Sequence, residues 1–94
     1  MNIQIQSLDF TAKEELKNFV TKKVTELSHF NNSILNGEVK LKLDKNNVGE
    51  NKICEIMLSL TGNDLFAKKQ CSTFEEATQQ TIDALRKQIE KLKA

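Results

Sequence analysis

The stretch KICEIMLSLTGNDLFAKKQCSTFEEA, residues 52–77, carries most of the information that decides the fold. In its first part every second residue is apolar, which is typical of a strand with one buried face; these residues are Cys54, Ile56, Leu58 and Leu60. Thr61-Gly62-Asn63-Asp64 has the composition of a turn, and residues 65–71 have the pattern of a second strand. The stretch therefore predicts a β-hairpin with strands at 52–61 and 65–71.

The last six residues of the same stretch predict where a helix begins. Ser72 with Glu75, and Thr73 with Glu76, have the spacing of a capping box, in which two side chains bind the first free backbone N–H groups. Beyond them, side chains at intervals of three and four form one stripe on a helix; they are Phe74, Ala77, Thr81, Leu85, Ile89 and Leu92. We therefore expect a second apolar face here, on a helix.

The N-terminal part of the chain predicts a strand followed by another helix. Apolar and polar residues alternate over residues 1–6, which favours a strand. Thr11 and Glu14 also match a capping box and predict a helix from Ala12. The Asn31-Asn32-Ser33 segment should end that helix. Its apolar stripe consists of Leu16, Phe19, Val20, Val24 and Leu27.

One more alternating segment, residues 38–44, completes the order β-α-β-β-β-α. Strands joined through a helix should be parallel with a right-handed crossover, and strands joined by short turns should be antiparallel. Each strand has one apolar face and each helix one apolar stripe. The expected fold is therefore α+β, a two-layer sandwich with a four-stranded mixed sheet and both helices on one face. The single domain would span residues 1–94, and its open sheet face would present Lys40, Lys42, Glu55, Ser59, Lys68 and Gln70.

Composition and motif content argue against several classes of protein. Apolar residues make up 38% and charged residues 29%, and no apolar run approaches the ~18 residues of a membrane span, so we expect a cytoplasmic protein without a membrane partner. Cys54 and Cys71 form no metal-binding spacing and should be reduced, buried side chains. The single histidine, His29, lies near a helix end, where a surface position is expected. With no glycine-rich phosphate loop or nucleophile motif either, we expect no enzyme activity, metal, cofactor or small-molecule substrate.

The charge is small in total but unevenly distributed. The net charge is +1, yet residues 86–94 contain four basic residues and one acidic residue, whereas residues 1–64 contain eight basic and nine acidic residues. Lys87 and Lys91 are four residues apart on a helix, where like charges repel by about 0.2–0.5 kcal/mol. They indicate an anion-binding helix end or, alternatively, a solvated helix end whose cations suit the dipole.

Other lysines also occupy informative positions. Lys23 falls in the apolar stripe between Phe19 and Leu27, so it either covers apolar surface with its stem or sits at the lip of a groove between the helices, directed at an anion. Adjacent strand residues face opposite ways, so Lys69 should lie on the helix side and Lys68 on the open sheet face. The alternative role of this lysine pair is to discourage pairing of an edge strand.

With enzyme and metal chemistry set aside, the sequence favours binding of phosphate groups by lysine and arginine. Such binding suits folded RNA that is recognised by its shape. Stacking of single-stranded bases has little support, because the phenylalanines fall mostly at core or cap positions and only Phe66 is expected to be exposed.

Three segments resemble the ribosome hibernation-promoting factor family, which includes the ribosome-associated inhibitor. They are FTAKEELKNFVTKKVTELSHF (10–30), ENKICEIMLSLTGNDLFAKKQ (50–70) and STFEEATQQTIDALRKQIEKLK (72–93), so the resemblance covers the whole chain. The most specific part is Phe-Glu-Glu-Ala followed by Asp-Ala-Leu-Arg-Lys-Gln in the second helix. The chain departs from the family pattern at Gln79-Gln80-Thr81 and at Asn31-Asn32.

The resemblance implies a ribosome-binding protein that silences translation in stationary phase or stress. Its partners would be the small ribosomal subunit and 16S rRNA, in the channel for tRNA and mRNA, and it would be a monomer off the ribosome. The length suggests the short form, without a dimerisation domain. The implied rRNA-binding residues are Lys22, Lys23, Lys69, Arg86, Lys87 and Lys91. Two alternatives remain at this point: a protein-binding module that uses the open sheet face or an edge, and a general duplex-RNA-binding domain.

Overall fold

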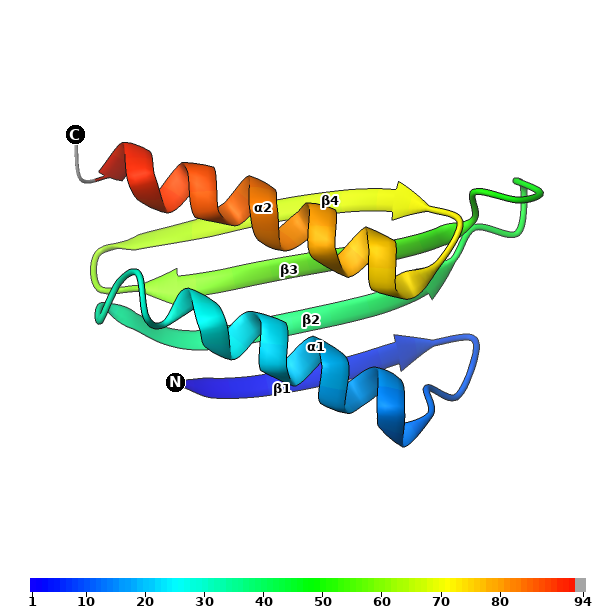
Figure 1. Cartoon of the computed structure of the whole chain (residues 1–94), viewed down its shortest axis with the longest axis horizontal. Helices are drawn as coiled ribbons and strands as arrows, with labels where there is room; N and C mark the ends of the chain where they lie inside the picture. The colour runs from blue at the N-terminus through cyan, green and yellow to red at the C-terminus, as the bar shows by residue number, and fades with distance from the viewer. Residues whose placement is uncertain (93–94) are drawn as a thin grey trace.

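The computed structural model describes residues 1–92, which form four strands and two helices in the order β1-α1-β2-β3-β4-α2 (Figure 1). Their bounds are β1 Asn2–Leu8, α1 Glu14–Leu27, β2 Ile34–Leu43, β3 Lys52–Leu60, β4 Asn63–Cys71 and α2 Phe74–Leu92. The predicted element order is confirmed.

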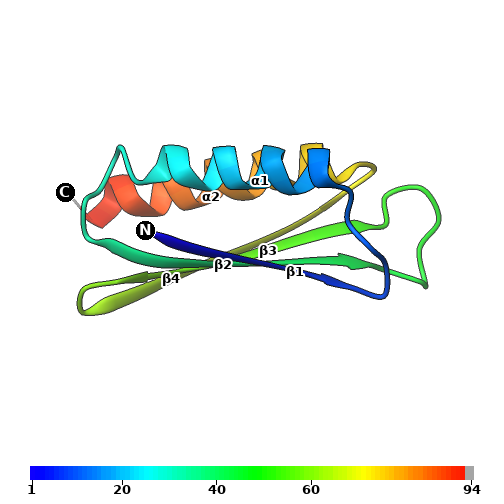
Figure 2. The ribbon, with the colours of Figure 1, turned by 90° about the horizontal axis from the view of Figure 1, so that it is seen from below.

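The strands form one sheet in the order β1-β2-β3-β4, with β1 parallel to β2 and the other neighbours antiparallel. Both helices lie on the same side of this sheet, as the edge-on view shows (Figure 2). The two-layer α+β sandwich and its mixed sheet are therefore confirmed. Because the strand order follows the chain order, β1 and β4 are the two edges.

The core fills the space between the helices and the sheet. From α1, Val20, Val24 and Leu27 are buried, while Leu16 and Phe19 are partly buried. The buried side chains of α2 include most of its predicted stripe and also Thr78 and Ile82; the full set is Phe74, Ala77, Thr78, Thr81, Ile82, Leu85 and Ile89. Helices that bury one stripe against a sheet in this way gain most of their stability from that contact.

Gly37 allows α1 to approach β2 closely. A Cβ atom at this position would lie 3.1 Å from Val24 Cγ1, which is tight for carbon atoms, and at an ordinary contact distance of 3.5 Å from Leu58 Cδ2. The missing side chain therefore leaves room for the Val24 side chain of α1.

The two helix starts differ from each other in how they are capped. Thr73 caps α2 as predicted, because its Oγ1 accepts a hydrogen bond of 3.1 Å from the Glu76 N–H. The prediction for α1 was wrong: the helix starts at Glu14 rather than Ala12, and Lys13 occupies the cap position without a side-chain bond. Ala12 is instead buried in the connection, 5% exposed, so tertiary packing overrides the local capping signal.

Other boundaries also differ from the sequence prediction. Helix α1 ends at Leu27, before the predicted Asn31-Asn32-Ser33 stop, and turns carry the chain into β2. Strand β2 begins at Ile34 rather than at residue 38, with a register shift between Ile34 and Asn36. The hairpin turn is shorter than predicted, because Asn63 pairs with Leu60. Gly62 takes the left-handed conformation that this tight turn needs, with φ at 80°.

Candidate RNA-binding surface

Three of the predicted lysines meet in a groove between β4 and α2. Lys69 lies on the helix side of β4 because it alternates with the exposed Lys68 and shares its face with the buried Ala67. Lys87 and Lys91 are one helical turn apart on α2. The groove has a volume of about 440 Å³ and is lined by Lys69, Gln80, Asp83, Ala84, Lys87, Gln88 and Lys91. The predicted position of Lys69 on the covered side is confirmed.

A hydrogen bond ties the two walls of this groove together. Gln88 Nε2 donates to the backbone oxygen of Phe66, at 2.9 Å, and thereby links α2 to the outer edge of β4. The only carboxylate of the lining is Asp83, whose Oδ1 accepts a hydrogen bond from Gln79 Nε2 at 3.1 Å. Within residues 1–92, no carboxylate lies within 4.0 Å of the Lys69, Lys87 or Lys91 ammonium groups. The groove thus presents three ammonium groups without an ion-pair partner in this part of the chain.

Arg86 lies on the other flank of α2 and contacts the segment that follows α1. Its guanidinium carbon is 4.5 Å from the centre of the Phe30 ring, a cation–π contact. Its Nε is 3.9 Å from Glu90 Oε1, which is too long for a hydrogen bond and leaves a weak, exposed ion pair. The aromatic ring therefore holds one face of the guanidinium.

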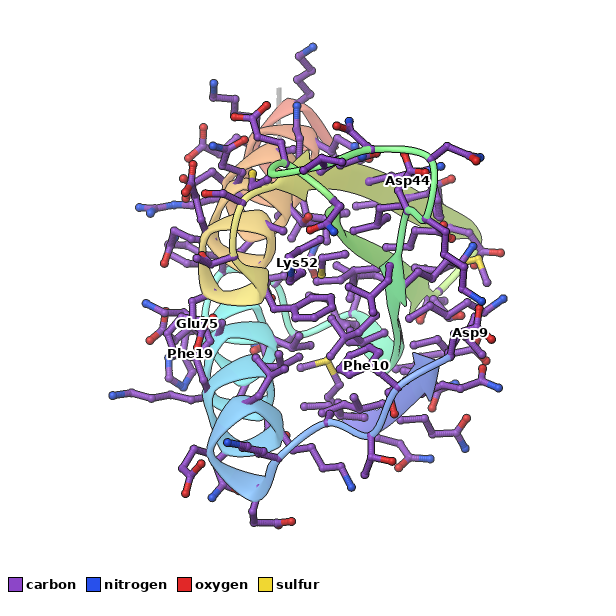
Figure 3. All side chains as sticks on the ribbon, turned by 90° about the vertical axis from the view of Figure 1, so that its right-hand side faces the viewer. Asp9, Phe10, Phe19, Asp44, Lys52 and Glu75 are labelled. Atoms are coloured by element: carbon purple, nitrogen blue, oxygen red, sulfur yellow. The ribbon has the colours of Figure 1, made fainter. Side chains whose placement is uncertain are left out.

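Lys23 is half buried where the sequence placed it, in the apolar stripe of α1. Its side chain is 24% exposed, and its ammonium lies 5.6 Å from the centre of the Phe19 ring. Figure 3, which looks along the helices, shows Phe19 on the helix side of the molecule. The nearest carboxylate oxygen, on Glu26, is 4.0 Å away, so the ion pair is weak. The stem covers apolar surface while the ammonium remains at the surface, which is the snorkelling arrangement.

Lys22 is exposed and does not line the groove. It is displaced by about 100° around α1 from Lys23, which turns it away from the sheet. All six predicted residues lie on the helix-bearing side, but the structure brings only Lys69, Lys87 and Lys91 into one concavity. Their role in binding RNA stays a prediction.

The open sheet face has a different electrostatic character. The Glu55 side chain lies between two cations, with Lys42 Nζ at 2.7 Å and Lys68 Nζ at 3.9 Å from its Oε2. The face also carries Glu38 and Asp64, which balance its lysines. Phe66 is 52% exposed on this face, as predicted, beside its cross-strand neighbour Met57. Two lysines of the open sheet face are therefore close to a carboxylate, whereas no carboxylate of residues 1–92 lies as close to the three groove lysines on the helix side.

The two cysteines and the single histidine lie where the sequence predicted. Cys54 and Cys71 are free and buried, as predicted, and burial raises the pKa of both thiols, so they are poor nucleophiles. His29 is exposed, in agreement with its predicted surface position. No group of three potential metal ligands occurs in residues 1–92. Neither helix of the described chain combines the length and the hydropathy needed to span a bilayer.

Sequence reasoning missed two residues that contact the predicted basic side chains or their elements. Gln88 was not recognised as the link to β4, and Phe30 was not recognised as the partner of Arg86. A signal existed for Gln88, because it follows Ala84 by four residues and so shares one helix flank with it. No local pattern pointed to Phe30, whose contact with Arg86 joins residues far apart in the chain.

Comparisons with known proteins agree with this fold and show the family. A ribosomal subunit interface protein from Coxiella burnetii superposes with a TM-score of 0.88 at 19% identity, over 99% of this chain and 98% of that one. The N-terminal domain of Thermus thermophilus Protein Y gives 0.84 at 20% identity, over 98% and 99%. At these identities the likeness shows a shared fold. A comparison with curated protein sequences gave no significant match.

The family assignment comes from the sequence of nearly the whole chain. The family model described as Sigma 54 modulation protein / S30EA ribosomal protein matches residues 3–94. This range includes both helices, all of β2, β3 and β4, and every residue of the basic groove. The resemblance noted in the sequence is thereby confirmed, and the chain belongs to the sigma 54 modulation protein / S30EA ribosomal protein family.

Proposed function

We propose that this protein binds the small ribosomal subunit through 16S rRNA, in the channel for tRNA and mRNA, and inhibits translation by excluding them. The observation that carries the proposal is the groove of Lys69, Lys87 and Lys91, in a chain whose family includes ribosomal proteins. The Coxiella relative is a ribosomal subunit interface protein, which supports the same kind of partner. Inhibition would require occupancy alone and no catalytic step.

The groove suits a phosphodiester backbone. Ammonium groups are compact point charges that neutralise phosphates and release the counterions condensed on RNA. Lys87 and Lys91 repel each other by about 0.2–0.5 kcal/mol in the free protein, and a phosphate placed between them removes that repulsion. Gln80 and Gln88 add amide groups at the groove wall, where they could bond to ribose hydroxyls. RNA would thus be recognised through its backbone and shape.

Arg86 extends the surface toward α1. A guanidinium whose face rests on an aromatic ring loses less freedom when its edge binds a phosphate, because it is already ordered. Lys23 is similarly held against Phe19. These two cations and the groove together supply five candidate phosphate contacts, and the exposed Lys22 would add a sixth if the RNA wraps around α1.

The proposal includes the setting in which the protein acts. It would be a cytoplasmic monomer off the ribosome and would act in stationary phase or stress. It would need neither a cofactor nor a metal ion. These statements follow from the family resemblance together with the binding site proposed above.

Cosedimentation with purified small subunits in a sucrose gradient tests the site. The test variant replaces Lys69, Lys87 and Lys91 with glutamine. A matched control replaces Lys40, Lys45 and Lys68 with glutamine; these lysines are exposed, and the change removes the same charge while keeping the Lys42–Glu55 ion pair. We expect the test variant to be absent from the small-subunit fractions and the control variant to be present in them. Both variants should show the same circular dichroism spectrum as the parent protein.

Three other outcomes would contradict the proposal in different ways. Equal loss in both variants would indicate non-specific charge attraction. Unchanged binding of the test variant would exclude the groove. Equal binding to an unrelated RNA duplex, in competition with small subunits, would favour a general duplex-RNA-binding domain.

A further inference from the structure

Strand β1 is an edge of the sheet that carries no protective feature. Its sequence, Asn2 to Leu8, is NIQIQSL, with seven residues, no charge and no proline. Within residues 1–92 no strand pairs with its outer side, and both helices lie above the sheet rather than beside this edge (Figures 1 and 2). Edge strands of soluble proteins are usually protected by charges, prolines or covering segments, because their free N–H and C=O groups can pair with another strand.

The opposite edge, β4, is protected in two ways. Its middle carries two consecutive cations, Lys68 and Lys69. The side chain of Gln88 also occupies an outward backbone acceptor, the oxygen of Phe66, at 2.9 Å. The contrast between the two edges favours pairing at β1 over pairing at β4.

The composition of β1 suits pairing with itself. In an antiparallel pair centred on Ile5, each residue faces one of the same parity, so the two Ile5 side chains are neighbours and Gln4 faces Gln6 of the second copy. Ile3 and Ile5 are only half buried on the helix side, so the pairing would cover more of them. The glutamines could exchange amide hydrogen bonds on the open side. No like charges would meet along the seam.

We propose that two copies of this chain associate through antiparallel pairing of their β1 strands. The two sheets become continuous, and all helices lie on one face because the side-chain parity is preserved. The contact is isologous and uses the β1 edge of both copies, so growth into a fibre would need pairing at β4, which its lysines and the Gln88 bond disfavour. This inference does not rest on the proposed ribosomal function. It departs from the monomer expected from the family resemblance, and the two differ in the mass measured at high protein concentration.

The association should be weak. A seven-residue strand is about 23 Å long, and pairing along one edge buries less than the ~1,000 Å² typical of stable interfaces. We therefore expect a dissociation constant between roughly 0.1 and 1 mM. Sedimentation velocity between about 10 μM and about 1 mM should show the mean mass rising toward twice that of the monomer.

Two variants at positions 4 and 6 test the register. Gln4→Lys with Gln6→Lys places like charges opposite each other across the seam, whereas Gln4→Lys with Gln6→Glu places opposite charges there and leaves the net charge unchanged. Both side chains are exposed, so the fold should survive. We expect at least a tenfold weaker association for the first variant and association at least as strong as the parent for the second.

A charge-matched control separates the seam from general repulsion. Asn46→Lys with Asn47→Lys adds two positive charges in the exposed connection between β2 and β3 and should leave association unchanged. A parent protein that remains monomeric at about 1 mM would overturn the proposal. So would equal behaviour of the two β1 variants, or loss of association in Phe66→Gln, which would assign the contact to the open sheet face.

Discussion

The salt dependence of binding to the small subunit should report how many phosphate contacts the proposed basic residues make. Five contacts, from the three groove lysines, Arg86 and Lys23, predict that the logarithm of the affinity falls with the logarithm of salt concentration with a slope of about −3.5 to −4.5. Raising salt from about 50 to about 200 mM would then weaken binding by roughly 100- to 500-fold. Replacing Lys69, Lys87 and Lys91 with glutamine leaves two contacts, so the same change in salt should weaken binding only about tenfold.

Fluorescence anisotropy of the labelled protein, titrated with small subunits at constant magnesium concentration, measures both slopes. The variant with Lys40, Lys45 and Lys68 replaced should keep the parent slope, because these lysines are not in the proposed contact surface. Equal slopes of log affinity against log salt concentration for the groove variant and the parent would refute the reasoning, even if the groove variant bound more weakly. That result would mean that the groove lysines act through the general field of the protein and not through phosphate contacts.

Three further predictions concern the fold. Thr73→Ala removes the cap of α2 and should cost about 1 kcal/mol of unfolding free energy, seen as a melting temperature lower by roughly 4–8 °C in circular dichroism; an unchanged melting curve would contradict the capping role. Gly37→Ala places a methyl group 3.1 Å from Val24 Cγ1 and should cost about 1–3 kcal/mol in denaturant unfolding, whereas a stabilised protein would show that α1 can move away. Burial raises the pKa of Cys54 and Cys71 above their ordinary value of 9.0, so the native state retains thiol protons that the unfolded state loses. The contribution of the two thiols to stability should therefore be complete below pH 9 and decline above it. A free energy of unfolding, measured by chemical denaturation, that does not fall above pH 9 would argue against this.

The fold was predictable because its two periodicities leave few arrangements. Alternation over residues 52–60 and a three-four spacing from Phe74 onward each define one buried face, and the short connections fix which neighbours are antiparallel. The start of α1 was not predictable in this way. Thr11 and Glu14 have the spacing of a cap, but burial of Ala12 in the connection outweighs a local bond worth about 1 kcal/mol.

The candidate site was only partly predictable. Helical spacing alone places Lys87 beside Lys91, and strand alternation alone places Lys69 on the helix side. Whether those three share a groove depends on how far α2 lies toward the β4 edge. That displacement is visible in the bond between Gln88 and the Phe66 backbone, which no short sequence pattern encodes.

The hydrogen bond from Gln88 to the Phe66 oxygen bears on both proposals, RNA binding in the groove and pairing at β1. By lying toward β4, α2 creates the lysine groove and also blocks the outer edge of that strand. At the other edge α1 lies above β1, and no side chain of residues 1–92 forms a comparable hydrogen bond to that strand. Breaking the bond with Gln88→Ala should therefore loosen the groove and expose the Phe66 backbone together. A variant that weakened RNA binding while leaving hydrogen exchange along β4 unchanged would show that the two features are independent.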